Sequence, residues 1–119
     1  MSSTLQITSL FLALASVTLP SCAPDSDPGA RLWRKKCAAC HGGDGAGRTR
    51  FAEGRPFADL TDGRFKHGSD RASVRRLVAD GDPSSTMPPF ADRLTPAEID
   101  AVVDYAMRLA TPVPAGSRP

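Results

Sequence analysis

The sequence predicts an all-α domain with three main helices and long loops, and three observations lead to this prediction. Apolar residues recur at helical spacing in three stretches, no stretch has the length of a convincing strand, and an aperiodic, glycine-rich segment separates the first two helices. The 119 residues suit one domain. The net charge of +2 comes from interleaved acids and bases rather than a basic stripe, which argues against nucleic acid as a partner.

The N-terminal residues are expected to be an export signal. Residues 10–19 form an apolar run that is too short to cross a bilayer and fits a signal peptide, although no Lys or Arg precedes it. Residues 19–22, Leu-Pro-Ser-Cys, resemble the lipobox of bacterial lipoproteins, in which the cysteine becomes the lipidated first residue. We therefore expect a lipoprotein-type signal over 1–21, acylation of Cys22 and a flexible tether over 22–29.

The folded domain is expected over residues 30–111, and its first helix over about 29–40. Pro28 is well placed at the start of this helix, because proline suits the first helical turn. Glycines after His41 are expected to end it. One side of the helix carries apolar or thiol side chains: Leu32, Trp33, Cys37 and Cys40.

The second helix is expected over residues 70–80. Ser69 is a natural N-cap, and Gly81 follows the last apolar position. Apolar residues then follow helical spacing at Val74, Leu77 and Val78.

The third helix has the clearest signals. Thr95 is expected to cap it, Pro96 to occupy its first position and Glu98 to close a capping box. An apolar stripe runs to about residues 109–110, through Ile99, Val102, Val103, Ala106 and Ala110. The proline-containing tail over 112–119 is expected to be flexible.

Residues 42–68 contain seven glycines and no helical or strand periodicity. A loop of this length inside a small domain requires something to pack on. The fold therefore points to a bound group that organises the loop.

Residues 37–41, Cys-Ala-Ala-Cys-His, form the attachment sequence of c-type haem. Two thiols at this spacing can add to neighbouring haem vinyl groups, and the following histidine can bind the iron. A zinc site would need a fourth ligand, and a thioredoxin-like cysteine pair would need a βαβ context. We therefore predict one covalent haem c at Cys37 and Cys40, with His41 as an iron ligand.

Met87 is the predicted second iron ligand. It precedes two prolines, which hold it extended and can present its sulfur to the iron, although filling a gap in the core is the simpler role. Met107 lies in the third helix and is expected to pack, while His67 is the rival ligand in a polar segment typical of a surface histidine. Ligation by His and Met favours a high potential and electron transfer.

With these motifs on one chain, residues 29–109 resemble a class I cytochrome c. The resemblance implies that the first and last helices cross, with Gly29 and Trp33 packing on Tyr105. It also implies that a proline carbonyl, here that of Pro56, accepts the proton of the ligating imidazole. Further residues are expected to form the haem wall: Leu60, Leu77, Phe90 and Leu94.

The resemblance implies a single-electron carrier of the bacterial cell envelope rather than an enzyme, with redox proteins of the periplasm or inner membrane as partners. It would be held by the lipid anchor, or be soluble in the periplasm if the signal is cut near Ala23. The alternatives are a subunit permanently bound to a dehydrogenase or terminal oxidase, and a haem sensor or peroxidase-like enzyme. The basic run over 34–36, beside the attachment motif, suits either docking to an acidic partner or a solvated helix face.

Overall fold

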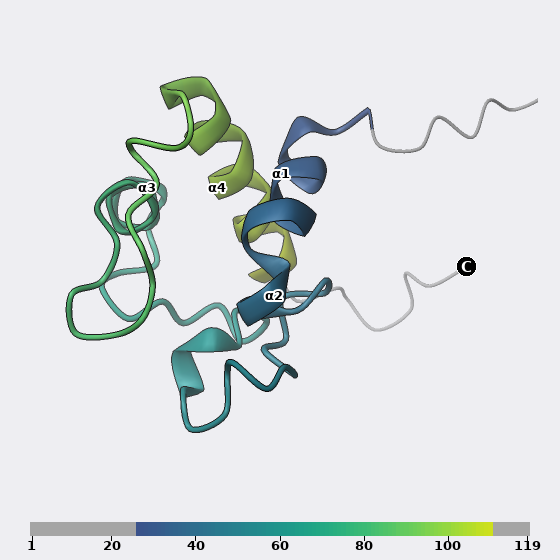
Figure 1. Ribbon diagram of the computed structural model, residues 1–119, viewed down its shortest axis with the longest axis vertical. Coiled ribbons are helices and arrows are strands. Elements are labelled where there is room, and N and C mark those ends of the chain that lie inside the picture. Colours follow the sequence, from purple (N-terminus) through teal and green to yellow (C-terminus); the bar gives the residue numbers. More distant parts are fainter. Residues whose placement is uncertain (1–25, 111–119) are drawn as a thin grey trace, which may run out of the picture.

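The computed structural model describes residues 26–110, which form an all-α domain (Figure 1). The predicted signal peptide, Cys22 and the tail over 112–119 lie outside the described residues. Within the described range there is no strand, so the predicted fold class is confirmed. No helix in this range is both long and apolar enough to span a bilayer. The elements are α1 (Pro28–Lys36), α2 (Ala38–His41), the 3₁₀ turn η1 (Pro56–Ala58), α3 (Arg71–Asp80) and α4 (Pro96–Ala110).

The first predicted helix is two helices, because the chain leaves regular helical geometry at Cys37, between α1 and α2. Helix α1 begins at Pro28, and the Asp27 carboxylate caps it by accepting from the backbone N–H of Gly29 at 2.8 Å. The last two residues of the expected tether therefore already belong to the fold. The break places Cys37 between the two helices and leaves the other two attachment residues, Cys40 and His41, on α2.

Helices α1 and α4 cross at very close range (Figure 1). A Cβ atom at Gly29 would lie 2.4 Å from the Ala101 carbonyl oxygen and 2.9 Å from Tyr105 Cβ. Only glycine permits this approach. One turn further on, the Trp33 and Tyr105 rings pack with their centroids 5.8 Å apart. The crossing that the resemblance implied is therefore present.

Helix α3 is capped by Asp70 and not by Ser69 as predicted. The Asp70 carboxylate accepts from the backbone N–H of Ser73 at 3.0 Å. The Ser69 hydroxyl instead accepts from the backbone N–H of Phe65 at 3.2 Å. Both residues are good caps, and the loop geometry before the helix decides between them.

Helix α4 begins with the predicted capping box. The Glu98 N–H donates to Thr95 Oγ1 at 3.2 Å, and the Thr95 N–H donates to the Glu98 carboxylate at 2.8 Å. Helix α4 also packs on α3, where Arg75 Nε donates to an Asp100 oxygen at 2.8 Å. These contacts fix α4 between α1 and α3.

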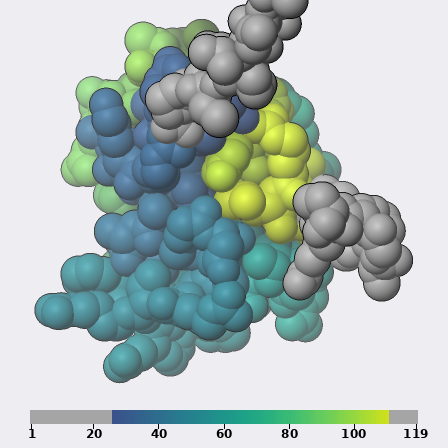
Figure 2. Space-filling model, turned by 90° about the vertical axis from the view of Figure 1, so that its right-hand side faces the viewer, coloured from purple at the N-terminus to yellow at the C-terminus, as the bar shows by residue number. Residues whose placement is uncertain are grey.

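The segment after α2 folds back under the α1–α4 pair, which Figure 2 shows side by side. The Leu60 N–H donates to the Gly45 carbonyl at 2.8 Å, and the Gly47 N–H donates to the His41 carbonyl at 2.7 Å. Gly47 has φ +65°, and a Cβ there would lie 2.8 Å from the Ala58 carbonyl carbon. The glycines thus let this segment pack directly against η1.

Candidate haem-binding site

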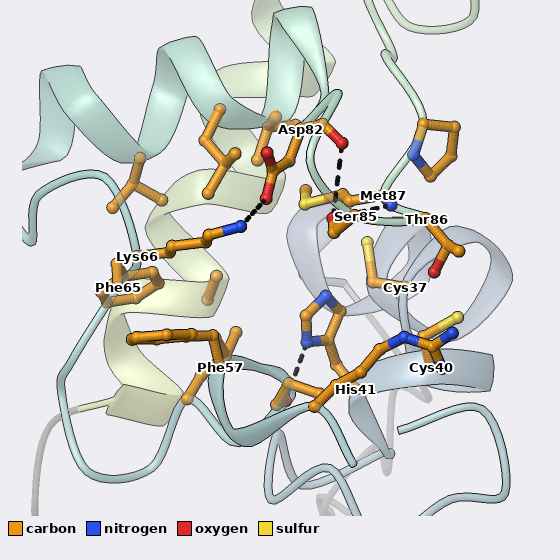
Figure 3. Close-up of a pocket in the computed structure, with 18 of the residues that line it drawn as sticks. Cys37, Cys40, His41, Phe57, Phe65, Lys66, Asp82, Ser85, Thr86 and Met87 are labelled. Carbon is orange, nitrogen blue, oxygen red and sulfur yellow. Dashed lines mark hydrogen bonds and ion pairs between the residues drawn. The ribbon is translucent and has the colours of Figure 1, made fainter. Parts of the chain in front are cut away.

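A cavity of about 690 Å³ opens between α1 and α2 on one side and the loop before Phe90 on the other (Figure 3). This volume lies in the range of small-molecule and cofactor sites. Its lining is mainly apolar and includes Trp33, Phe57, Leu60, Phe65, Val74, Leu77, Val78, Phe90, Val102 and Ala106. The pocket therefore has the size and the apolar surface to hold a large planar cofactor.

All three attachment residues line this pocket: Cys37 lies between α1 and α2, and α2 carries Cys40 and His41. Cys37 is half-buried and Cys40 is exposed, and both are free thiols. Burial, and to a smaller extent the nearby Cys40, raises the pKa of the Cys37 thiol to about 11. Among residues 26–110, no three His, Cys, Asp or Glu side chains gather as a metal-ion site.

The His41 ring is held by a backbone carbonyl, and this carbonyl belongs to Ala58. His41 Nδ1 lies 2.9 Å from the Ala58 oxygen, which can only accept, so Nδ1 carries the proton. The prediction that Pro56 supplies this carbonyl is wrong, because the η1 turn directs the carbonyl of its third residue toward the ring. Pro56 lines the pocket. The other ring nitrogen of His41 faces the pocket (Figure 3).

Trp33 supports the same wall. Its indole Nε1–H donates to the Gly42 carbonyl at 2.9 Å, and its ring lies 5.7 Å from the His41 ring, centroid to centroid. The side chain is 2 % exposed, so this hydrogen bond is sheltered from water. Trp33 therefore joins α1 to the turn that directly follows His41.

Met87 lies on the opposite wall of the pocket and faces His41 (Figure 3). The rival residues do not line this pocket. Met107 packs against the core from α4. His67 is 49 % exposed, and its Nε2 lies 3.4 Å from an Asp82 carboxylate oxygen. Met87 is therefore the only one of the three described candidates that faces His41 across the pocket.

Three of the four residues expected to form the haem wall line the pocket: Leu60, Leu77 and Phe90. Leu94 is buried in the core but does not line the pocket. Phe57 and Phe65 also line it, although their segment has no periodicity that could indicate a buried face. Their aromatic character within an otherwise polar loop is the one signal in the sequence that marks them.

One carboxylate on the pocket lining was missed by sequence reasoning. Asp82 follows the predicted helix end at Gly81 and belongs to no motif, but its side chain is buried at 6 % exposure. The Lys66 ammonium, followed by the Ser84 hydroxyl, holds the pKa of this carboxyl well below its usual range. Asp82 is therefore a fixed negative charge at the start of the loop that carries Met87.

The basic run Arg34, Lys35 and Lys36 is exposed at the end of α1. Lys36 also borders the pocket, next to Cys37 and Cys40. The exposed Cys40 marks the side on which a bound cofactor would approach solvent. Positive charge thus lies on one side of this opening, where it could contact an acidic partner.

Residues 24–105 match the protein family described as cytochrome c oxidase, cbb3-type, subunit III. The match includes the attachment motif, Met87 and every pocket-lining residue except Ala106. The chain belongs to this family. It is a class I c-type cytochrome domain that binds one covalent haem c and transfers electrons.

Curated relatives agree with this assignment. The chain is 31 % identical over 90 residues to the cbb3-type cytochrome c oxidase subunit FixP of Azorhizobium caulinodans. The aligned region covers 76 % of this chain and 29 % of that protein. It is 40 % identical over 80 residues to the cbb3-type cytochrome c oxidase subunit CcoP of Cereibacter sphaeroides. That aligned region covers 67 % of this chain and 26 % of the relative. The chain thus spans less than a third of the length of these relatives.

Solved structures share the fold. A chain of the reducing HAO-like protein complex of Kuenenia stuttgartiensis superposes with a TM-score of 0.65 at 29 % identity, covering 71 % of this chain and 43 % of that one. Cytochrome c6 of the diatom Phaeodactylum tricornutum superposes with a TM-score of 0.55 at 28 % identity, covering 70 % and 91 %. The second neighbour is thus matched over nearly its whole length.

Proposed function

We propose that this cytochrome carries single electrons through a haem whose iron is bound by His41 and Met87, at the periplasmic side of a bacterial membrane. The observation that carries the proposal is the opposition of these two side chains across one apolar pocket that also contains Cys37 and Cys40. A haem attached there would supply a one-electron iron couple. The pocket residues fit this group in size, polarity and ligand type.

Each wall contributes a different property. The Ala58 carbonyl holds Nδ1 of His41, so the ring cannot rotate freely and its other nitrogen becomes a stronger ligand. The Met87 sulfur is neutral and soft, which raises the potential relative to two nitrogen ligands. With His41 and Met87 both bound, the iron would have no position left for oxygen or peroxide. This argues for electron transfer alone and against a sensor or peroxidase-like enzyme.

Replacing Met87 by Ala tests the ligation. We expect the ferric holoprotein to lose the weak far-red sulfur-to-iron absorption band, and its reduction potential to fall. Absorption spectroscopy and a redox titration measure both effects. Met107→Leu is the matched control, because Met107 packs away from this pocket, and it should keep both properties. A band that persists in Met87→Ala would show that the ligand assignment is wrong.

The partner that the proposal favours is a membrane-bound terminal oxidase. The named relatives are cbb3-type oxidase subunits, and this chain matches only part of each. The exposed basic run over 34–36 beside the pocket supports docking to an acidic redox partner. A permanently bound subunit would co-purify with the oxidase from native membranes at fixed stoichiometry, whereas a free carrier would separate from it in high salt.

Acylation of Cys22 would place the domain at the membrane surface. The expected lipobox and most of the expected tether precede α1. Several acyl chains give stable anchoring where one gives marginal binding. Mass spectrometry of protein isolated from native membranes should find acyl chains on Cys22. A mature chain that is unmodified and begins after that residue would exclude the lipid anchor.

A further inference from the structure

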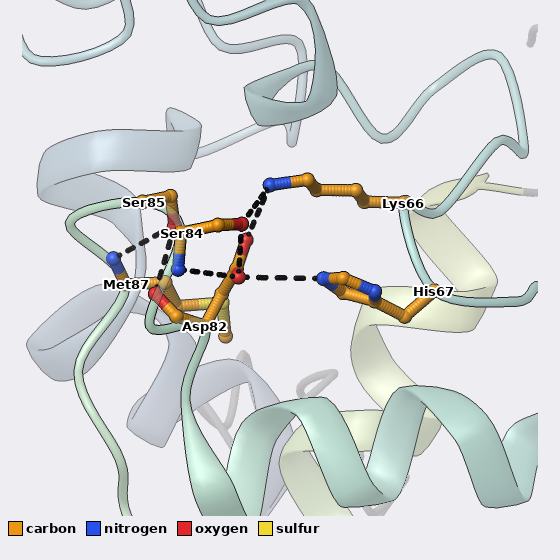
Figure 4. Close-up of polar contacts among 6 residues, drawn as sticks. All are labelled: Lys66, His67, Asp82, Ser84, Ser85 and Met87. Carbon is orange, nitrogen blue, oxygen red and sulfur yellow. Dashed lines mark hydrogen bonds and ion pairs between the residues drawn. The ribbon is translucent and has the colours of Figure 1, made fainter.

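Residues 82–87, the Met87 loop, are organised around the buried Asp82 carboxylate (Figure 4). This carboxylate accepts from the Ser84 N–H at 3.0 Å and from the Ser84 hydroxyl at 2.7 Å. The Lys66 ammonium donates to its other oxygen at 2.9 Å, and His67 Nε2 lies 3.4 Å from the first. The carboxylate is thus surrounded by donors from its own loop and from a distant one.

Backbone hydrogen bonds join the two ends of the Met87 loop. The Asp82 N–H donates to the Met87 carbonyl at 3.0 Å, and the Ser85 N–H donates to the Asp82 carbonyl at 3.0 Å. The Met87 N–H donates to the Ser85 hydroxyl oxygen at 3.2 Å. Any displacement of Asp82 is therefore passed directly to the backbone of Met87.

Lys66 lies in the segment after α2, sixteen residues before Asp82, and its ion pair with Asp82 links that segment to the Met87 loop. The Lys66 side chain is 31 % exposed and that of Asp82 is 6 % exposed, so water screens this pair only in part. The Lys66 ammonium also donates to the Ser84 hydroxyl, on the same loop. Removal of the ammonium would leave a buried carboxylate without its cation, which is costly unless the loop opens to water.

We propose that Lys66 and Asp82 are positioning residues that hold Met87 toward the iron and so determine how readily another ligand displaces its sulfur. This inference rests on the proposed ligation by Met87. The pair does not touch the iron, and it acts through the Met87 loop. The exchange it controls breaks one sulfur–iron bond and forms one bond to the entering ligand, with no change in the oxidation state of the iron.

The proposal is tested by titrating the ferric holoprotein with imidazole. Loss of the far-red band measures how much imidazole has replaced the Met87 sulfur. Lys66→Gln and Asp82→Asn should each raise the affinity for imidazole by roughly tenfold or more, since each removes a partly buried charge-assisted bond. Lys66→Arg keeps the cation and should stay close to the wild type. The gain in imidazole affinity of the double variant should not exceed the sum of the two single gains, in free-energy terms, because both substitutions remove the same contact.

Asp62→Asn is the matched control. It removes the exposed ion pair between the Asp62 carboxylate and the Arg64 guanidinium, which lie 2.8 Å apart. Both residues are in the same segment as Lys66, but neither lines the pocket. Its affinity for imidazole should equal that of the wild type. Denaturant unfolding of every variant separates a general loss of stability from the ligand effect.

The outcomes distinguish the two proposals. If the wild type lacks the far-red band, or Met87→Ala keeps it, the proposed ligation fails. If the band behaves as proposed but Lys66→Gln binds imidazole no better than Asp62→Asn, only the positioning role fails. Lys66→Gln decides the matter even if Asp82→Asn does not fold, because Lys66 is the more exposed partner.

Discussion

The His41 wall of the pocket is carried by a helix, whereas the Met87 wall is a loop held by a contact with another loop. The His41 N–H donates to the Cys37 carbonyl at 2.9 Å within the α2 turn, and its ring is held by Ala58. Met87 instead lies on a loop that Lys66 fastens from another segment. Substitutions that disturb helix packing should therefore affect the His41 wall. Substitutions that disturb loop contacts should affect the Met87 wall.

A closely packed glycine lies next to each wall, so substitution of these two glycines can test the difference. Gly29 lies where α1 crosses α4, on the side of Trp33 and His41. Gly81 ends α3, and a Cβ there would lie 2.8 Å from the Met87 carbonyl oxygen. The same substitution at each position therefore acts on a different wall.

Gly29→Ala should have the larger effect on stability. The new methyl would overlap the Ala101 carbonyl and Tyr105 Cβ, both fixed in α4, so the two helices must separate. We expect the free energy of unfolding to fall by about 3 kcal/mol, the upper part of the usual range for overpacking. Denaturant unfolding of the holoprotein measures this loss. Molecules that remain folded should keep the far-red band, since the Met87 loop is untouched.

Gly43→Ala is the control for that substitution. Gly43 has no positive φ, and no atom lies within 4 Å of a Cβ built there. Alanine should be neutral or stabilise by up to about 1 kcal/mol through the unfolded chain. Equal stabilities of Gly29→Ala and Gly43→Ala would contradict the close helix crossing.

Helix α4 and the attachment motif were predictable because their signals are local. The capping box of Thr95 and Glu98 lies within four residues, and the haem motif within five. The all-α class followed from helical spacing in the same way. The resemblance to class I cytochrome c supplied the α1–α4 crossing, which spacing alone does not specify.

The remaining features depend on how distant segments meet. The choice of Ala58 rather than Pro56 as the partner of His41 follows from the η1 turn, for which the sequence has no periodic signal. The Lys66–Asp82 pair joins two aperiodic loops, and sequence spacing does not show which lysine meets which aspartate. The break at Cys37 interrupts a continuous helical pattern, so it was also missed.

Gly81→Ala should have a smaller effect on stability but a direct one on the ligand. Gly81 has φ +72°, where alanine costs about 1–2 kcal/mol. Gly54→Ala is the matched control, since Gly54 has φ +70° and no atom within 4 Å of a Cβ. We expect Gly54→Ala to lose about 1–2 kcal/mol of unfolding free energy. Gly81→Ala should lose more than Gly54→Ala, because its methyl also overlaps the loop backbone at Met87, but less than Gly29→Ala, because a loop can shift where a packed helix cannot. Only Gly81→Ala should bind imidazole more tightly, because its methyl displaces the Met87 carbonyl. Equal imidazole affinities in the two variants would mean that the α3 end does not position Met87.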